Sequence, residues 1–156
     1  MAKLLLGSWL QADPQADIAL VSPRYVQQHI PGGTISAETI VGVLPTTNEL
    51  VRLELSGKDI RQAIRQRRPM VAGLSRADDW LLADGAPLQH DRLYTVLVPD
   101  TLYAGGNYYD LAEPDPTPIW TGIDWRQPVL DWLQDNPTSW ISPLDDLLGV
   151  SVEPAY

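Results

Sequence analysis

Residues 49–68 read ELVRLELSGKDIRQAIRQRR, and the spacing of their apolar side chains changes in the middle. Before Ser56, apolar residues at positions 51, 53 and 55 alternate with polar ones, as in a strand with one buried face. After Ser56, apolar residues at positions 60, 63 and 64 recur at helical spacing, and Ser56 with Asp59 is placed as a capping box. The stretch therefore predicts a strand that passes directly into a helix.

Further elements are predicted on both sides of this stretch. Asp17–Val21 is an apolar run typical of a buried strand, and Ser36 is an N-cap for a short helix that ends at Pro45. Two strands are expected around a turn at Asp84-Gly85, the second over Leu93–Val98. A short helix over Leu4–Trp9 and an acidic loop over Glu113–Pro118 are also expected. A last helix is expected over Gln127–Gln134, capped by Asp124 and Gln127. Its inward-facing residues are Val129, Trp132 and Leu133. Together they predict an α+β fold, a mixed β-sheet with packed helices, in one domain over residues 1–156.

Composition and charge exclude several classes of protein. The 156 residues contain no cysteine, so disulfide scaffolds and thiolate metal sites are excluded. The net charge of −9 argues against nucleic acid as a partner, because binding it requires Lys and Arg to neutralise phosphates. The basic run from Arg61 to Arg68 is the counter-observation, and its helical spacing favours a solvated helix face.

The N-terminal stretch MAKLLLGSWL does not indicate a membrane protein, because its apolar run is too short to span a bilayer and has no evident signal-peptide cleavage site. We expect a cytoplasmic protein if Met1 is the natural start. A periplasmic or extracellular location is expected if the chain is excised from a longer precursor.

The segment DTLYAGGNYYDL, residues 100–111, places a Gly-Gly pair among three tyrosines. Glycines let the backbone approach a ligand closely, and tyrosines offer flat faces with a polar tip. The segment is typical of a site for a planar ring and equally of a well-packed turn. Metal and nucleophile patterns are absent from the sequence, since His29 and His90 each stand alone and Ser22 and Ser75 have no recognisable base.

The order of several motifs is similar to that in the C-terminal domain of the 5′-nucleotidase family. These motifs are ADIALVS at 16–22, IPGGTISAETIVGVLPTTNELVRLELSGKDIRQAI at 30–64 and DGAPLQHDRLYTVLVPDTLYAGGNYYDL at 84–111, and the resemblance runs from about Leu5 to about Asp135. It implies an α+β domain that binds the nucleoside part of a substrate. Hydrolysis and its divalent metals are then expected in a separate metallophosphoesterase domain or chain, with no cofactor in this chain.

The resemblance also shows where this sequence departs from the family. The family's Asn-x-Gly-Gly-x-Arg is replaced by SPRYVQ at 22–27, so Gln27 stands in place of a phosphate-gripping arginine. Thr46 and Thr101 stand where the family has aromatic rings that stack on the base. Asn107 stands in place of the acidic residue that accepts hydrogen bonds from the ribose hydroxyls. The Gly-Leu-Arg motif becomes GLSR, which moves the arginine one place, to Arg76.

The resemblance implies that four loops converge on one concavity. We expect it to hold a nucleotide-like or other planar, polar small molecule through Arg24, Gln27, Asn48, Arg76, Tyr103, Asn107 and Tyr108. Three readings remain open: a non-catalytic binding or interaction module, the substrate-binding half of a nucleotide hydrolase whose metal domain lies upstream or on another chain, and a stand-alone domain with a new small-molecule site.

Overall fold

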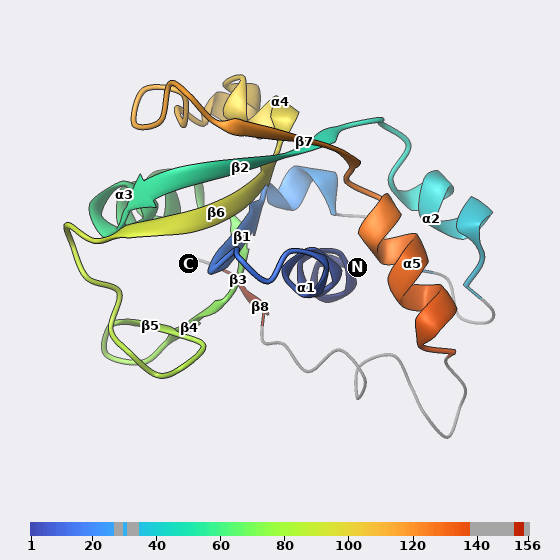
Figure 1. Ribbon diagram of the computed structural model, residues 1–156, viewed down its shortest axis with the longest axis horizontal. Coiled ribbons are helices and arrows are strands. Elements are labelled where there is room, and N and C mark those ends of the chain that lie inside the picture. The colour runs from blue at the N-terminus through green and yellow to red at the C-terminus, as the bar shows by residue number, and fades with distance from the viewer. Residues whose placement is uncertain (27–29, 31–34, 138–151, 155–156) are drawn as a thin grey trace.

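The computed structural model describes residues 1–26, 30, 35–137 and 152–154. Helices and strands follow one another in mixed order, as expected for an α+β chain (Figure 1). The helices are α1 Ala2–Ala12, α2 Ala37–Val43, α3 Gly57–Arg67, α4 Asp100–Tyr103 and α5 Gln127–Asp135, with 3₁₀ turns η1 Pro23–Tyr25 and η2 Gly106–Tyr108. The strands are β1 Ile18–Val21, β2 Glu49–Ser56, β3 Met70–Ala72, β4 Leu74–Arg76, β5 Trp80–Leu82, β6 Leu93–Pro99, β7 Ile119–Asp124 and β8 Val152–Pro154.

The main sheet is mixed, as the sequence predicted. Its strand order is β7-β2-β6-β1-β3-β8, and β4 and β5 form a separate two-stranded ladder. Strand β1 runs parallel to β6 and antiparallel to β3, while β2 runs antiparallel to both β6 and β7. The parallel pair β1 and β6 lies near the centre, where both faces of a sheet are covered.

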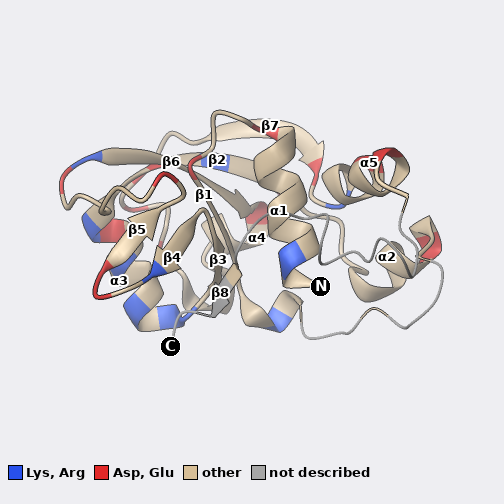
Figure 2. Ribbon diagram, turned by 90° about the horizontal axis from the view of Figure 1, so that it is seen from below, with Lys and Arg blue, Asp and Glu red and all other residues tan. Residues whose placement is uncertain are grey.

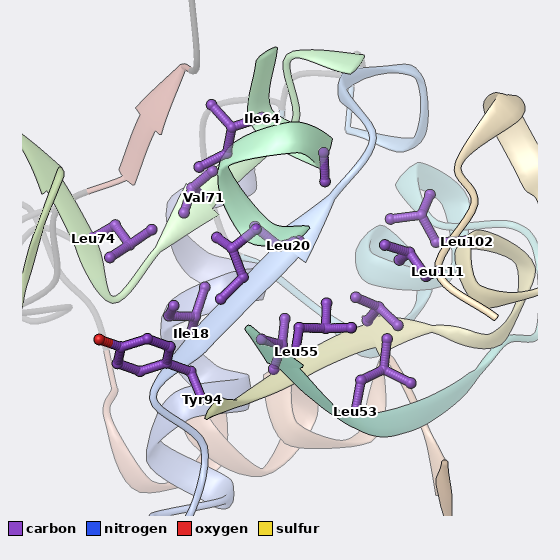
Figure 3. Packing of buried hydrophobic residues seen from close by; sticks show 14 of the residues in the cluster. Ile18, Leu20, Leu53, Leu55, Ile64, Val71, Leu74, Tyr94, Leu102 and Leu111 are labelled. Atoms are coloured by element: carbon purple, nitrogen blue, oxygen red, sulfur yellow. The ribbon is translucent and has the colours of Figure 1, made fainter. Parts of the chain in front are cut away.

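Strand β1 explains how the sheet divides two hydrophobic clusters. Ile18 and Leu20 pack with α3 and the inner face of β2, whereas Ala19 and Val21 pack with α1 and α5. Successive side chains of a strand point to opposite faces, so a strand buried on both faces is apolar at every position. Figure 3 shows the first cluster, in which Leu53 and Leu55 of β2 face the same interior as Ile18 and Leu20.

The junction of β2 and α3 confirms the prediction made from residues 49–68. Val51, Leu53 and Leu55 are fully buried, and the Ser56 hydroxyl oxygen accepts from the Asp59 backbone N–H at 3.2 Å. The reciprocal bond differs from a capping box, because the Asp59 carboxylate accepts from the Ser56 hydroxyl. The last helix is confirmed as well, with Val129 and Trp132 buried and Leu133 half-buried against the cluster of α1 and α5.

Three local predictions need correction. The Asp84-Gly85 turn exists, with Gly85 at φ 82°, but β5 before it pairs with β4, and β6 pairs with β1 and β2. Helix α1 extends well beyond Leu4–Trp9, and the acidic loop is followed by a strand, β7, that was not predicted. Helix α5 has Arg126 at its N-cap, because the Asp124 carboxylate accepts from the Arg126 backbone N–H and so closes the preceding turn.

No helix in the described ranges is long and apolar enough to cross a membrane.

Candidate functional site

The strand register gathers three loops at one edge of the sheet. Leu50 pairs with Pro99, so β2 begins where β6 ends, and β1 runs parallel to β6 and ends at the same edge. The loops at this edge are residues 22–26, 45–48 and 100–109. We call this edge the loop edge (Figure 1).

The loop after β1 is held against the other two by Tyr25. Its ring meets the ring of Trp125 edge to face, with 5.8 Å between the centroids. Its hydroxyl lies 3.2 Å from the position that a Cβ on Gly106 would occupy. Ser22 serves as the cap of η1, because its hydroxyl accepts from the Arg24 backbone N–H at 3.4 Å, and the Arg24 side chain is exposed.

Trp125 and Asn48 fix the turn at residues 45–48 to the loop edge. The Trp125 indole N–H donates to the Thr46 carbonyl at 3.0 Å, and the Trp125 backbone N–H donates to the Asn48 carbonyl at 2.9 Å. The Asn48 side chain is buried, and one orientation of its amide gives both the oxygen and the nitrogen hydrogen-bond partners. In that orientation the amide nitrogen donates to the Thr47 carbonyl and to the Asp100 carboxylate, both at 3.3 Å. Asn48 therefore joins the turn to the start of α4, and its burial leaves little of it for a ligand.

The loop at residues 100–109, which we call the Gly-Gly loop, has several residues with positive φ. Gly105 is at φ 87°, and the next two residues after Gly106, Asn107 and Tyr108, are also left-handed at φ 55° and 63°. Non-glycine residues in this region cost roughly 1–2 kcal/mol each, and such strain is common at functional sites. Thr101 Oγ1, within the same loop, is buried without a hydrogen-bond partner in the described structure.

The tyrosines of the loop differ in their engagement. The Tyr103 hydroxyl donates to the Asp115 carbonyl at 3.2 Å, and its ring lies edge to face with Trp120. Tyr108 is 77% exposed, with the Arg67 guanidinium 5.8 Å from its ring centre. Burial raises the pKa of Tyr109 above its ordinary value. Only Tyr108, among these three, presents most of its surface to solvent.

The seven predicted site residues are distributed over two parts of the molecule. Arg24, Asn48, Tyr103, Asn107 and Tyr108 lie in the three loops of the loop edge, and Gln27 lies outside the described residues. Arg76 does not join them. Since Val21 pairs with Met70 and Ala19 with Ala72, strand β3 leads the chain away from the loop edge, and Arg76 follows at the other end, beside α3.

Sequence reasoning missed Trp125 and Asp100 as organisers of these loops. Trp125 contacts Thr46 across 79 positions of sequence, and nothing local to either residue signals this contact. Among the described residues, no group of three His, Asp or Glu side chains is placed to hold a metal ion. The loop edge therefore offers hydrogen-bonding groups, one guanidinium and one exposed aromatic face, a set suited to binding a polar ring.

This combination of mixed sheet, flanking helices and clustered loops defines an α+β domain. The chain belongs to the family described as 5′-nucleotidase, C-terminal domain, whose family profile matches residues 2–113. The family resemblance drawn from the sequence is thus confirmed, as is the α+β fold.

Solved structures share this fold. The crystal structure of a 5′-nucleotidase precursor from Thermus thermophilus has a TM-score of 0.77 and 22% identity over 99% of this chain and 34% of that one. The NAD nucleotidase of Haemophilus influenzae has a TM-score of 0.71 and 13% identity over 87% of this chain and 29% of that one. A curated relative, Endonuclease YhcR of Bacillus subtilis (strain 168), is 23% identical over 155 aligned positions, and the match covers 87% of this chain and 13% of that protein. The chain thus spans about a third or less of the length of these relatives.

Proposed function

We propose that this chain is a binding module that takes a planar, polar small molecule at the loop edge and does not hydrolyse it. The observation that carries the proposal is that the three loops remain joined to one another. Tyr25 packs on Trp125, Trp125 donates to Thr46, and Asn48 reaches Asp100. These contacts support a binding site whose loops are held together while the side chains at the family's recognition positions differ.

The exchanged side chains argue for weak binding of nucleosides. Each base–aromatic stack is worth ~1–3 kcal/mol, and a micromolar complex has ~8 kcal/mol in total. Threonines at positions 46 and 101 cannot stack, and Tyr25 and Tyr103 are engaged in edge contacts with tryptophans. Tyr108 is left to replace one stack, so we propose a site that selects polar groups of the ligand over its ring. Its residues are Arg24, Gln27, Tyr103, Asn107 and Tyr108, and buried Asn48 holds residues 45–48 in place beside them.

The test is chemical-shift mapping of the labelled chain with uncharged nucleosides, nucleotides and sugar phosphates. We expect saturable shifts at residues 22–25, 46–48 and 101–109, and weaker binding of the best ligand by Tyr108→Ala. The exposed Tyr108 ring has little packing to lose, so this variant should fold normally. Shifts confined to other surfaces, or no binder in the panel, would remove the proposal.

A second candidate function has its own observation. The two nucleotidase structures are about three times as long as this chain, which covers 34% and 29% of them. The chain would then be the substrate-binding half of a nucleotide hydrolase, and a metallophosphoesterase domain, upstream or on another chain, would supply the divalent metals. Mapping the reading frame on both sides of the coding sequence distinguishes the candidates, because the second requires a metallophosphoesterase coding region in frame or in a coexpressed gene.

A further inference from the structure

A second polar hollow is lined by no residue of the loop edge. It has a volume of about 380 Å³ and lies between α3 and the β4–β5 hairpin. Arg61, Arg65 and Arg68 line it from the helix side, and Arg76 lines it from β4. We call it the arginine hollow. Figure 2 shows the Lys and Arg positions that gather on α3 and β4, in a chain whose net charge is −9.

Two of the four arginines are held in place by neighbouring groups. Arg61 forms a two-pronged ion pair with Asp79 and donates a further bond to the Leu88 carbonyl at 2.5 Å. The Arg61 guanidinium holds the pKa of the Asp79 carboxyl below its ordinary value, so the pair stays charged at neutral pH. The Arg76 guanidinium lies 5.5 Å from the ring centre of Trp80, a distance typical of a cation–π contact.

Arg65 and Arg68 are different, since both are exposed and neither makes an ion pair within the described part of the chain. Asp78 and Asp79 also line the hollow, so four guanidinium groups face two carboxylates. The C-terminal end of α3 carries roughly half an elementary negative charge. This reduces the excess positive charge of the hollow but does not reverse its sign.

Stabilisation of the helix end does not account for the whole cluster. Basic residues in a last turn interact favourably with the helix dipole, which explains Arg65 and Arg68 taken alone. Arg76 belongs to another element, yet it brings a fourth guanidinium to the same hollow. Arg68 ends the helix at φ 50°, in the left-handed region where glycine or asparagine is favoured. Like charges at helical spacing repel one another, and a bound anion would relieve this repulsion.

We propose that the arginine hollow binds a small phosphate-bearing molecule with at least two negative charges. Guanidinium groups form forked pairs of hydrogen bonds with phosphate oxygens, and arginines on two facing elements can grip one anion from both sides. The volume is that of a small-molecule site, and a chain with net charge −9 disfavours a long polyanion that would extend beyond it. The proposal is independent of the loop edge, because no residue is shared between the two sites.

Pyrophosphate is the probe, with inorganic phosphate, citrate and a ten-residue thymidine oligonucleotide as comparison arms. In a titration of the labelled chain, we expect pyrophosphate to saturate at about 1 mM or below and to shift the amides of residues 61–68 and 74–80. Citrate, which carries carboxylates only, and the oligonucleotide should bind more weakly. Tighter binding of either one than of pyrophosphate would overturn the assignment of the ligand class.

The variants test the location. Arg65→Gln with Arg68→Asn removes the two charges that form no ion pair within the described residues, and asparagine tolerates the left-handed backbone at position 68. We expect this variant to bind pyrophosphate at least about tenfold more weakly, or ~1.4 kcal/mol. Arg67→Gln is the control for charge lost outside the hollow. It removes one charge from the same turn, against two in the double variant, and Arg67 lies beside Tyr108 and does not line the hollow.

The control should stay within about twofold of the parent chain, since it loses only diffuse attraction screened by salt. Equal weakening by the control and the double variant would show non-specific attraction and overturn the proposal. Absence of saturable binding to the parent chain, or shifts centred on residues 22–25 and 101–109, would overturn it too. Unchanged thermal unfolding of both variants confirms that their comparison reports binding.

Discussion

Gly106 occupies a position where a side chain does not fit. A Cβ there would lie 2.3 Å from the Thr101 carbonyl oxygen, and this obstacle is backbone rather than a flexible side chain. We therefore expect Gly106→Ala to lower the free energy of unfolding by about 2–3 kcal/mol, the usual cost of forcing extra atoms into a packed region. Chemical denaturation at neutral pH measures this change.

Gly42 is the matched control for this substitution. It lies in the exposed part of α2, and a Cβ there would meet no atom within 4 Å. Since alanine favours helix more than glycine does, Gly42→Ala should raise the free energy of unfolding by roughly 0.5–1 kcal/mol. If both variants changed stability equally, close packing of the Gly-Gly loop would be contradicted.

The pair Asp124 and Arg126 predicts a pH-dependent contribution to stability. The Arg126 guanidinium donates to the Asp124 carboxylate at 2.9 Å and 2.5 Å and holds the pKa of Asp124 below its ordinary value of 3.8. A lowered pKa in the folded state means that the contribution is present above pH 3.8 and is lost as the pH falls through the folded-state value.

Because the Asp124 side chain is 37% exposed, the pair should be worth only about 0.5 kcal/mol. We expect Asp124→Asn and Arg126→Gln to show this coupling in a double-mutant cycle at pH 7 and to lose it in strong acid. Thermal unfolding of the four proteins at both pH values is the measurement. A coupling of the same size in strong acid would contradict the ion pair.

Among the elements, those with a local signal were predicted and those that depend on distant partners were not. Strand β2 and helix α3 were predicted because hydrophobic period and cap residue both lie within residues 49–68. Strand β7 was missed because it is an edge strand whose Ile119, Trp120 and Ile123 are all exposed, so no alternation marks a buried face. Likewise, the turn at Asp84-Gly85 was visible, but the pairing of β5 with β4 was not.

The parts of the candidate site with a local signal were likewise predicted, and those that depend on distant partners were not. Motif order identified the loops after β1, before β2 and after β6, and the parallel register of β1 with β6 brings them together. The place of Arg76 could not be read from motif order, because it depends on β3 running antiparallel to β1. Trp125 was missed for the same reason: its partners are defined by tertiary packing.

Strand β2 predicts a strong contrast between adjacent positions. Leu53 is fully buried in the cluster that β2 forms with residues of α3 and β6, whereas the Glu54 side chain is exposed on the opposite face. Leu53→Ala should cost about 3 kcal/mol of unfolding free energy through lost burial and a cavity, and Glu54→Ala less than about 0.5 kcal/mol. Urea denaturation of both variants is the measurement, and comparable losses would contradict the register of β2.

At the scale of the whole molecule, two polar regions are lined by different residues. The loop edge lies where β1 and β6 end and β2 begins, and the arginine hollow lies beside α3 and the β4–β5 hairpin. An uncharged nucleoside and pyrophosphate should therefore bind without competing, since their proposed sites share no residue.

Catalysis is not expected of the chain alone. We expect no metal-dependent hydrolysis of AMP, a UDP-sugar, a cyclic nucleotide or phenyl phosphate in the presence of Mn²⁺, Co²⁺ or Zn²⁺. The reason lies in the sequence: its two histidines stand alone, without neighbouring ligands at the spacing that two-metal phosphoesterases need. Phosphate release is measured with and without a chelator at each purification step. Turnover that follows the protein through purification and disappears with the chelator would contradict a purely binding role, because metal-activated water would then be formed on residues of this chain.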